Sequence, residues 1–270
     1  YKKVKESGIE MVILRAGFTG YGINKLKNKD KLFEEHYNGF KNVGIPIGVY
    51  WYSCAYTEEE AEEEALKVLE IVKNKEIELP IFIDVEDNHD ITKSGLAKQN
   101  QYELSRNELT KVVARFCEII EKNGYYVGIY ASTHWLNKKL DMNILKRYDI
   151  WVAHYNVKKP TYNGTYGIWQ YTSKGNVSGI NGNVDLDYIY KAYPDIIRNK
   201  GLNNLSQKKY DKNNSEENIY YKVQKGDNLT KIAKKYNIDL RILYEENKNI
   251  IGNNPNLIYP NQILKITKKY

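Results

Sequence analysis

The sequence has little of what metal-bound or disulfide-bonded proteins need. It contains two cysteines, Cys54 and Cys117, and four histidines among 270 residues. Two cysteines exclude a disulfide-rich scaffold and an all-cysteine zinc site, and no HExxH-type spacing indicates a catalytic zinc helix. We therefore expect no metal and no cofactor, and we expect both cysteines to be buried free thiols.

Long apolar stretches are also missing. No run of about 18 apolar residues occurs, so no transmembrane helix is expected. Hydrophobic residues make up 41% of the chain and charged residues 28%, which is typical of a globular protein and not of a disordered chain. At about 150 residues per domain, the length predicts two domains.

Charge and composition divide the chain. Residues 1–194 carry 26 basic and 26 acidic side chains, whereas residues 220–270 carry 10 basic and 4 acidic ones. Residues 199–219 are polar and rich in Asn and Lys, which is typical of a linker. We predict a large domain over residues 1–195, a linker over 196–219 and a small domain over 220–270. A basic domain favours an anionic partner, although a solvated basic surface explains the charge equally well.

Strand and helix signals alternate in the large domain. Thr57 with Glu60, and Ser105 with Glu108, form capping boxes ahead of two helices, the second of which ends at Gly124. A further helix is predicted over residues 30–43, and strands over 9–16, 45–54, 79–86, 125–132, 149–155 and 166–172. This order predicts an α/β fold of parallel strands joined by crossover helices, with an irregular end where the later strands follow one another directly.

Two acidic residues end the strand expected at residues 79–86. Asp84 and Glu86 are two positions apart, so they share a face at the C-terminal end, where parallel α/β folds hold their active sites. Neighbouring carboxyls push their pKa values apart, which leaves one protonated as a general acid and one ionised, as glycosidic bond cleavage requires. The alternative is that both mark the solvated end of a strand.

Other residues at strand positions are candidates for the same pocket. Asp185 follows glycine-containing turns and is a further candidate carboxylate. Aromatic rings stack on the apolar faces of sugars. The candidate substrate-binding residues are Tyr50, Tyr52, Tyr130, Tyr155 and Gln170. For any single tyrosine, core packing is the alternative.

Seven stretches of residues 1–195 resemble the glycoside hydrolase family 25 lysozymes, which are N-acetylmuramidases. They are VKESGIEMVILRAGF, NVGIPIGVYWYSCAYTEEEAEEEA, LPIFIDVED, GYYVGIYASTHWLN, YDIWVAHY, YGIWQYTSKGNVSGI and NVDLD. The resemblance implies an irregular TIM-like β/α barrel and hydrolysis of the β-1,4 bond between N-acetylmuramic acid and N-acetylglucosamine. It implies that Glu86 is the general acid/base and that Asp185 is the late acidic residue near the pocket. Asp84 would stabilise the developing positive charge or assist the substrate's N-acetyl group as nucleophile.

One part of the family pattern is not found. Family members begin with a strand that carries a DxS-type motif, whose Asp is a further active-site carboxylate, and this sequence begins inside the segment that follows. Without that strand, we expect two exposed sheet edges. A shortened sequence, a differently closed barrel and an inactive copy are the alternatives, and the intact Asp84 and Glu86 favour an active enzyme.

Residues 221–267 resemble a LysM module in the stretches YKVQKGDNLTKIAKKYN and NPNLIYPNQILKI. The pattern itself predicts a small α+β unit of order βααβ, with strands at 221–223 and 263–266. The resemblance implies binding of glycans that contain N-acetylglucosamine. The candidate glycan-binding residues are Gly226, Asp227, Asn228, Leu229, Pro255, Asn256 and Ile258. A small DNA-binding helical pair is the alternative, but no recognition helix stands out.

We therefore expect a peptidoglycan hydrolase, an endolysin or an autolysin, that acts at the cell wall as a monomer. Peptidoglycan is the expected partner, and neither nucleic acid nor a membrane is expected to bind. A non-catalytic wall-binding protein is one alternative. A chitinase-like hydrolase is another, but it needs a DxxDxDxE pattern, and the comparable segment FIDVEDN lacks the earlier aspartates.

Overall fold

The computed structural model describes the chain except for residues 21–24, 88–100, 206–215, 253 and 270. The chain forms two compact units, Tyr1–Gln207 and Lys208–Tyr270. The first unit continues past residue 195, because it includes helix α7 (Tyr193–Asn199) and the buried Leu205. Strand β9 of the second unit already begins at Glu216. Both ends of the predicted linker are thus folded, and its residues 206–215 lie outside the described part of the chain.

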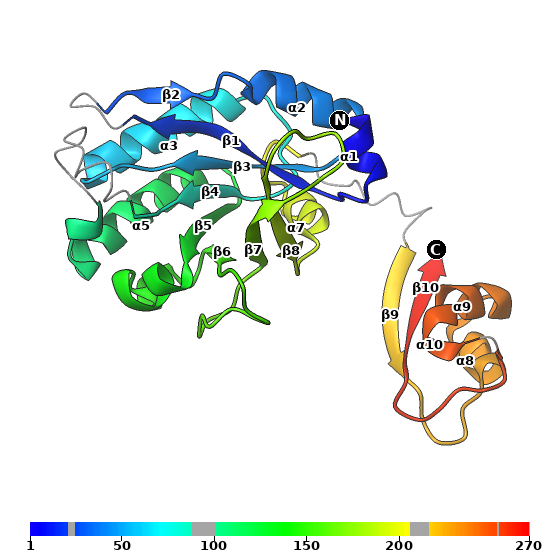
Figure 1. The fold of residues 1–270 in the computed structure, drawn as a ribbon. Helices are drawn as coiled ribbons and strands as arrows, with labels where there is room; N and C mark the ends of the chain where they lie inside the picture. Colours follow the sequence, from blue (N-terminus) through cyan, green and yellow to red (C-terminus); the bar gives the residue numbers. More distant parts are fainter. Residues whose placement is uncertain (21–24, 88–100, 206–215, 253, 270) are drawn as a thin grey trace. The chain divides into compact units, whose positions relative to one another are not determined.

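An eight-stranded mixed sheet is the centre of the first unit (Figure 1). Its strands, in chain order, are β1 (Val12–Thr19), β2 (Lys27–Lys29), β3 (Ile47–Tyr52), β4 (Ile81–Asp84), β5 (Val127–Ser132), β6 (Asp149–Ala153), β7 (Ile168–Gly175) and β8 (Val184–Ile189). In space the order is β2-β1-β3-β4-β5-β6-β7-β8. The six strands β1, β3, β4, β5, β6 and β7 are parallel to one another. Strands β2 and β8 pair antiparallel at the two ends of the sheet. The parallel sheet is as predicted, whereas β2, with its polar sequence KNK, was not predicted.

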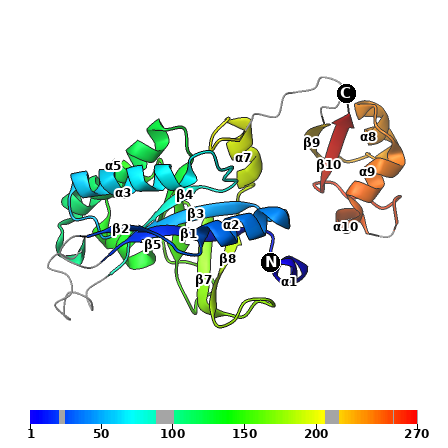
Figure 2. The same cartoon turned by 90° about the horizontal axis from the view of Figure 1, so that it is seen from above.

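Helices connect the parallel strands and cover the sheet. They are α1 (Lys2–Glu6), α2 (Phe33–Asn42), α3 (Glu58–Val72), α5 (Arg106–Lys122) and α6 (Met142–Leu145), with the short helical turns η1 (Gln101–Glu103) and η2 (Trp135–Lys139). Helices α3 and α5 lie alongside each other against one face of the sheet (Figures 1 and 2). The three helices predicted in this domain are therefore confirmed as α2, α3 and α5.

The two predicted capping boxes differ in one hydrogen bond. At the start of α5, Ser105 Oγ accepts from the Glu108 N–H, and the Glu108 carboxylate accepts from the Ser105 N–H at 2.9 Å. At the start of α3, Thr57 Oγ1 accepts from the Glu60 N–H at 3.2 Å. The Glu60 carboxylate, however, accepts from Lys25 Nζ at 2.7 Å. It also accepts from the Tyr56 N–H at 2.6 Å, one residue before Thr57. The predicted box at Thr57 is thus half formed, because Glu60 bonds to Tyr56 and Lys25 and not to the Thr57 N–H.

The sheet curls without closing into a complete barrel. Within the described residues no pairing joins β2 to β8, so the predicted TIM-like barrel is an open half-barrel with the two edges expected from the sequence. The loop from β7 to β8 packs on α1 instead. A Cβ at Gly179, where φ is +93°, would lie 2.8 Å from Lys3 Cβ. Both the backbone and this close contact therefore require glycine there.

Two apolar cores fill the two faces of the sheet. The core between the sheet and helices α3 and α5 includes Val49, Trp51, Ile81, Ile83, Ile129, Val68 and Val113. The core on the inner, concave face includes Phe82, Tyr130, Trp151 and Ile168 with Tyr193 and Ile197 of α7. Since both faces are buried, these strands are nearly continuous apolar runs in the sequence. The inner core leaves the carboxyl ends of the strands to polar side chains.

The second unit is a two-stranded antiparallel sheet with three helices packed on it (Figure 1). The strands are β9 (Glu216–Lys222) and β10 (Ile263–Lys269), and the helices are α8 (Leu229–Tyr236), α9 (Leu240–Glu246) and α10 (Lys248–Ile251). The predicted βααβ order is confirmed, with α10 as an additional helical turn. In the described part of the chain, no helix has the length and apolar character needed to cross a membrane. Cys54 and Cys117 are buried free thiols, as expected.

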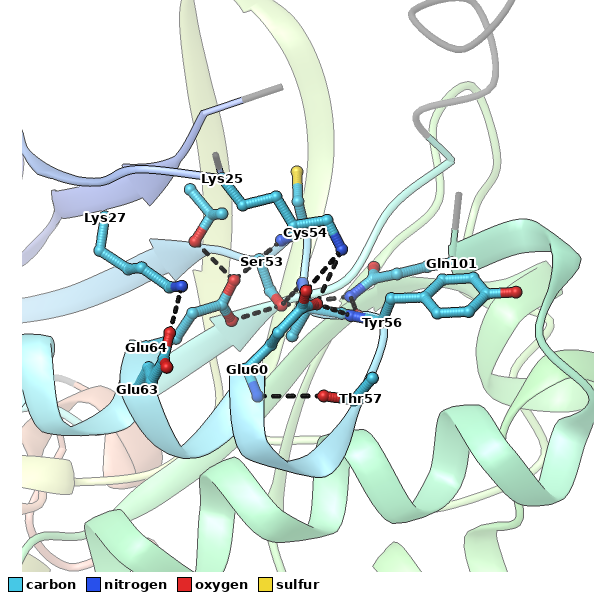
Figure 3. Close-up of polar contacts among 12 residues, drawn as sticks. Lys25, Lys27, Ser53, Cys54, Tyr56, Thr57, Glu60, Glu63, Glu64 and Gln101 are labelled. Atoms are coloured by element: carbon cyan, nitrogen blue, oxygen red, sulfur yellow. Dashed lines mark hydrogen bonds and ion pairs between the residues drawn. The ribbon is translucent and has the colours of Figure 1, made fainter. Parts of the chain in front are cut away.

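A buried carboxylate joins the ends of β1 and β3 to helix α3 (Figure 3). Glu64 accepts hydrogen bonds from Thr19 Oγ1 at 2.6 Å, Ser53 Oγ at 2.6 Å and the Cys54 N–H at 3.0 Å. Burial raises the pKa of Glu64 to about 7, although these three bonds oppose the rise. Glu64 thereby holds the loop after β3 in place beside the carboxyl edge of the sheet.

Glu64 should make the stability of the first unit depend on pH. Its pKa is above the ordinary 4.5 in the folded protein, so its contribution to stability is complete below about pH 4.5 and is lost as pH rises through about 7. The contribution amounts to up to about 3 kcal/mol. We expect Glu64→Gln to flatten the fall in unfolding free energy between about pH 5 and pH 8.

Denaturant unfolding followed by tryptophan fluorescence measures this effect, because all four tryptophans lie in the first unit. Glu70→Gln is the matched control on the same helix, since Glu70 is an exposed partner of Lys67. An unchanged pH dependence in Glu64→Gln would contradict the role of Glu64.

Candidate active site

The register of the parallel strands aligns one row of side chains at their carboxyl ends. It pairs Tyr52 with Asp84, Asp84 with Tyr130, and Tyr130 with Trp151. Residues that are paired across a parallel sheet point to the same face. These four side chains therefore lie next to one another on the inner face, where Tyr130 and Trp151 also belong to its apolar core.

Asp84 is a strongly enclosed carboxyl. Its exposed fraction is 5%, and its Oδ1 atom finds no hydrogen-bond partner among the described residues. Burial raises the pKa of Asp84 well above its usual range, and the charges of Glu86 and Asp185 raise it further. Arg15 opposes this rise. The neutral, protonated form of Asp84 is therefore favoured.

Glu86 lies two residues beyond Asp84 and is only half-buried. Burial raises the pKa of Glu86 as well, and the charge of Asp185 contributes. Hydrogen bonds with Tyr130 and Asp84 act in the opposite direction, because they stabilise the ionised Glu86. Asp84 and Glu86 thus share one proton in a hydrogen bond, and their titration belongs to the pair. In the protein alone, Asp84 holds this proton.

Two tyrosines meet a buried amide beside Glu86. Tyr130 Oη donates to Gln170 Oε1 at 2.8 Å, and Tyr155 Oη donates to the same oxygen. A phenol has one proton, so Tyr130 can donate either to Gln170 or to the ionised Glu86. Gln170 has an exposed fraction of 2%. Gln170 therefore holds the two tyrosine hydroxyls from the buried side, whereas Tyr155, at 38% exposed, reaches the surface.

Trp151 is the centre of the aromatic floor under the carboxyls. Its ring centroid lies 4.6 Å from that of Tyr130, 5.2 Å from Phe82 and 6.1 Å from Tyr50, all in edge-on geometry. Burial and the charge of Asp84 raise the pKa of Tyr50, so its hydroxyl stays protonated. Tyr52 is half-buried at the position paired with Asp84. Trp151 was predicted to lie in a strand but was not among the candidate site residues.

Strand β8 brings two further carboxyls to this face. Asp185, selected from the sequence, has a pKa raised by partial burial, and its charge acts on both Asp84 and Glu86. Asp187, two positions on, accepts a hydrogen bond from Trp151 Nε1 at 2.6 Å. Burial raises the pKa of Asp187 to about 7, and the Trp151 bond opposes that rise. The same two-residue spacing that links Asp84 to Glu86 was the available signal for Asp187.

The arrangement is suited to moving a proton next to a developing positive charge. One proton is shared by an enclosed and a half-exposed carboxyl, and further carboxylate groups stand nearby. No three His, Cys, Asp or Glu side chains of the described chain are grouped as a metal site would need.

Comparison with known proteins identifies the fold family. Residues 1–180 match the model for glycosyl hydrolases family 25. The chain belongs to this family. Residues 221–267 match the LysM domain. The autolytic lysozyme of Clostridium acetobutylicum is 29% identical over 187 residues, which are 69% of this chain and 51% of that protein. The chain thus spans about half the length of this curated relative.

Solved structures show the same fold as this family 25 domain. The modular autolysin LytC from Streptococcus pneumoniae superposes with a TM-score of 0.57 at 29% identity, covering 69% of this chain and 42% of that one. The bacterial lysozyme from Streptomyces coelicolor superposes with a TM-score of 0.59 at 23% identity, covering 76% of this chain and 91% of that one.

In the LysM domain, the first candidate loop is held together by its own polar residues. Asp227 accepts hydrogen bonds from Tyr221 Oη and the Gln224 N–H, both at 2.8 Å. Asn228 caps α8 by accepting from the Lys231 N–H at 2.8 Å. These side chains shape the turn, and Gly226 adopts the φ of +90° that the turn requires.

The remaining candidate residues of the LysM domain differ in exposure. Leu229 is 3% exposed and belongs to the apolar core, so its side chain does not present a surface. Pro255 and Asn256 are exposed, and Ile258 is half-buried against the core. The second candidate loop is therefore the more accessible of the two.

Asp187 should position β8 through its bond to Trp151. We expect Asp187→Leu to leave the indole N–H without its partner, which costs about 1–3 kcal/mol of stability. Asp187→Asn keeps an acceptor oxygen and should retain most of that stability. Thermal unfolding followed by tryptophan fluorescence, together with the rate of glycan digestion, measures the effect.

Trp151→Phe supplies a second test of the same bond, because it removes the donor and keeps an aromatic ring. Combined with Asp187→Leu, it should cost less than the sum of the two single changes. Additive losses, or a Leu variant as stable as the Asn variant, would show that the bond does not hold β8.

Proposed function

We propose that this protein is a peptidoglycan hydrolase that cleaves the β-1,4 bond between N-acetylmuramic acid and N-acetylglucosamine. The observation that carries the proposal is the pairing of the enclosed Asp84 with the half-exposed Glu86 at the carboxyl edge of a family 25 domain. The relatives support it: one is named an autolytic lysozyme. The LytC autolysin, 28% identical, has also been solved in complex with a synthetic peptidoglycan ligand.

Exposure separates the roles of the two carboxyls. Glu86 is half-buried and can reach the oxygen of a bound glycosidic bond, whereas Asp84 lies beneath it. In our proposal, Asp84 returns the shared proton to Glu86, and Glu86 delivers it to the leaving oxygen as the bond to the muramic acid C1 breaks. Glu86 then accepts a proton from the attacking water and passes it back to Asp84, which restores the starting state.

Asp84 would act on the substrate's acetamido group. Its Oδ1 atom has no partner among the described residues, and the N–H of an N-acetyl group can supply one. The carboxylate that remains after the proton has moved also stabilises the positive charge that develops at C1. Asp185 adds negative charge nearby. Tyr50, Tyr52 and Tyr155 offer ring faces and hydroxyls to the sugars.

The LysM domain would hold the enzyme on its polymer. Glycan binding through the loops at residues 226–229 and 255–258 raises the local concentration of substrate around the family 25 domain without adding new chemistry. We place the action of the protein at the bacterial cell wall, with peptidoglycan as its partner. One chain supplies both the catalytic and the anchoring site, so the proposed active form is a monomer.

Digestion of purified peptidoglycan tests the activity. Products are reduced with borohydride and identified by mass spectrometry. We expect reduced muramic acid ends from the parent chain and at least about a hundredfold fewer from Glu86→Gln, because general acid–base catalysis contributes about that much. Glu10→Gln is the control and should behave like the parent, because Glu10 is exposed and distant from Glu86 in the sequence. Reduced glucosamine ends, or no products from the parent chain, would contradict the proposal.

The shared proton also predicts the pH dependence of the activity. The pKa of Glu86 is raised above its ordinary 4.5, so the proton donor persists as pH rises beyond that value. We expect a bell-shaped dependence of kcat/KM on pH, with its alkaline limb well above pH 4.5. Initial rates on a soluble glycan chain across the pH range measure it. An alkaline limb centred on the ordinary value would contradict the coupled pair.

A further inference from the structure

The two units differ in how their basic side chains form ion pairs. In the family 25 domain, many basic residues form ion pairs, such as Lys25–Glu60 and Lys27–Glu63, which Figure 3 shows above α3. Further pairs are Lys29–Glu34, Lys41–Glu78, Arg115–Glu62, Arg147–Glu121 and Lys191–Asp149. In the described part of the LysM domain, the ion pair is Lys248–Glu245 at 3.9 Å.

The acidic residues of the LysM domain are already engaged within the fold. Asp227 accepts from Tyr221 and from a backbone N–H. Asp239 caps α9 by accepting from two backbone N–H groups, and Glu246 accepts from Thr267 Oγ1 at 2.7 Å. Residues 220–270 hold four acidic and 10 basic side chains. The charge of Asp227 acts on Lys231 and Lys235, and an excess of positive charge remains.

Four unpaired lysines lie together at α8 and the turn before it. Lys231, Lys234 and Lys235 have helical spacing and are exposed, and Lys225 is exposed in the turn. Lys231 Nζ donates to the carbonyl of Gly226 at 3.0 Å, which brings it against the turn that carries Lys225. No ion pair involves any of the four within the described residues. We call Lys225, Lys231, Lys234 and Lys235 the lysine cluster.

The cluster borders the proposed glycan site. Gly226, whose carbonyl holds Lys231, is the first residue of the candidate loop 226–229. Lys235 Nζ lies 4.6 Å from the ring centroid of Tyr221, whose hydroxyl bonds to Asp227 of that loop. A polymer seated on the loop would therefore pass beside four positive charges.

We propose that the lysine cluster binds the phosphodiester groups of an anionic polymer attached to the cell wall. This inference rests on the proposed wall-binding function and adds a second ligand chemistry to the LysM domain. The cluster contains lysines and no arginine. Lysine binds phosphate as a compact point charge, without the bidentate geometry that arginine offers to carboxylates and phosphates alike. A polymer with one charge per repeat can meet several of these lysines at once.

A purely structural role of the cluster would be confined to the helix end. Lys234 and Lys235 lie in the last turn of α8, where positive charge stabilises the helix dipole. Lys225 and Lys231 are not at that end, so a dipole role explains only half of the cluster. Binding to a surface that lacks phosphate separates the two roles.

The test compares wall preparations. The full chain carrying Glu86→Gln, which leaves the wall undigested, is bound to purified peptidoglycan that retains its phosphodiester polymer. It is also bound to the same material after hydrofluoric acid has removed the polymer. Dissociation constants are measured by sedimentation at about 50 mM and about 300 mM salt, because screening separates charge from shape. This Glu86→Gln chain is the parent of the comparison. The four-lysine variant carries Glu86→Gln and, in addition, Gln in place of all four lysines of the cluster.

We expect the parent to bind the untreated wall on the order of tenfold more tightly than the treated wall at low salt, with the difference shrinking at high salt. The four-lysine variant should lose this difference and bind the treated wall as the parent does. A control in which Lys73, Lys111, Lys122 and Lys158 of the family 25 domain become Gln removes the same charge and should bind like the parent.

Three results would overturn the proposal. They are unchanged binding of the variant to the untreated wall, an equal loss on the treated wall, and tighter binding of the parent to double-stranded DNA than to the untreated wall. The last result would assign the cluster to nucleic acid. Failure of the proposed function is seen separately, because the chain with Glu86 in place would then leave the treated wall undigested and the Glu86→Gln chain would not bind it.

Discussion

Two carboxyl groups that have little water around them cannot both carry a charge, and the site depends on this constraint. Asp84 is placed between Tyr52 and Tyr130 by the strand register, and burial disfavours its ionised form. Glu86, two residues on, is less enclosed and gains a hydrogen bond from Tyr130. Two carboxyl groups within three residues thus acquire different proton affinities, and the environment reverses the ordinary order, in which aspartic acid is the stronger acid.

Because the sheet is open, the position of β8 depends on side-chain contacts. In a closed barrel each strand is held on both sides, whereas β8 pairs with β7 alone among the described strands. The Trp151 bond to Asp187 crosses from β6 to β8 over the inner face, and the β7–β8 loop packs on α1 through Gly179. The β7–β8 pairing and these two contacts keep Asp185 on the same face as Asp84 and Glu86. On the other side of the sheet, Glu64 holds the ends of β1 and β3 together.

Much of this could be predicted from the sequence, for identifiable reasons. The parallel strands are buried on both faces and show as apolar runs, and Asp84 stands out as a charge at the end of one. Strand β2 was missed because its three polar residues carry no such signal. The incomplete capping box at Thr57 and the role of Asp187 were also missed. Asp187 depends on Trp151, a partner remote in the sequence. Glu60 bonds to the remote Lys25 and to the N–H of Tyr56, one residue before the expected Thr57.

The central claim is that Asp84 and Glu86 share one proton at pH values above the ordinary pKa of either residue. Carbon-13 NMR of the side-chain carboxyls, assigned with Asp84→Asn and Glu86→Gln, measures it directly in the full chain. The account predicts that, as pH falls, the pair takes up its first proton at a pH well above the ordinary 3.8 of an aspartic and 4.5 of a glutamic acid. It also predicts that either substitution changes the titration of the remaining carboxyl. Two independent titrations at the ordinary values would contradict it.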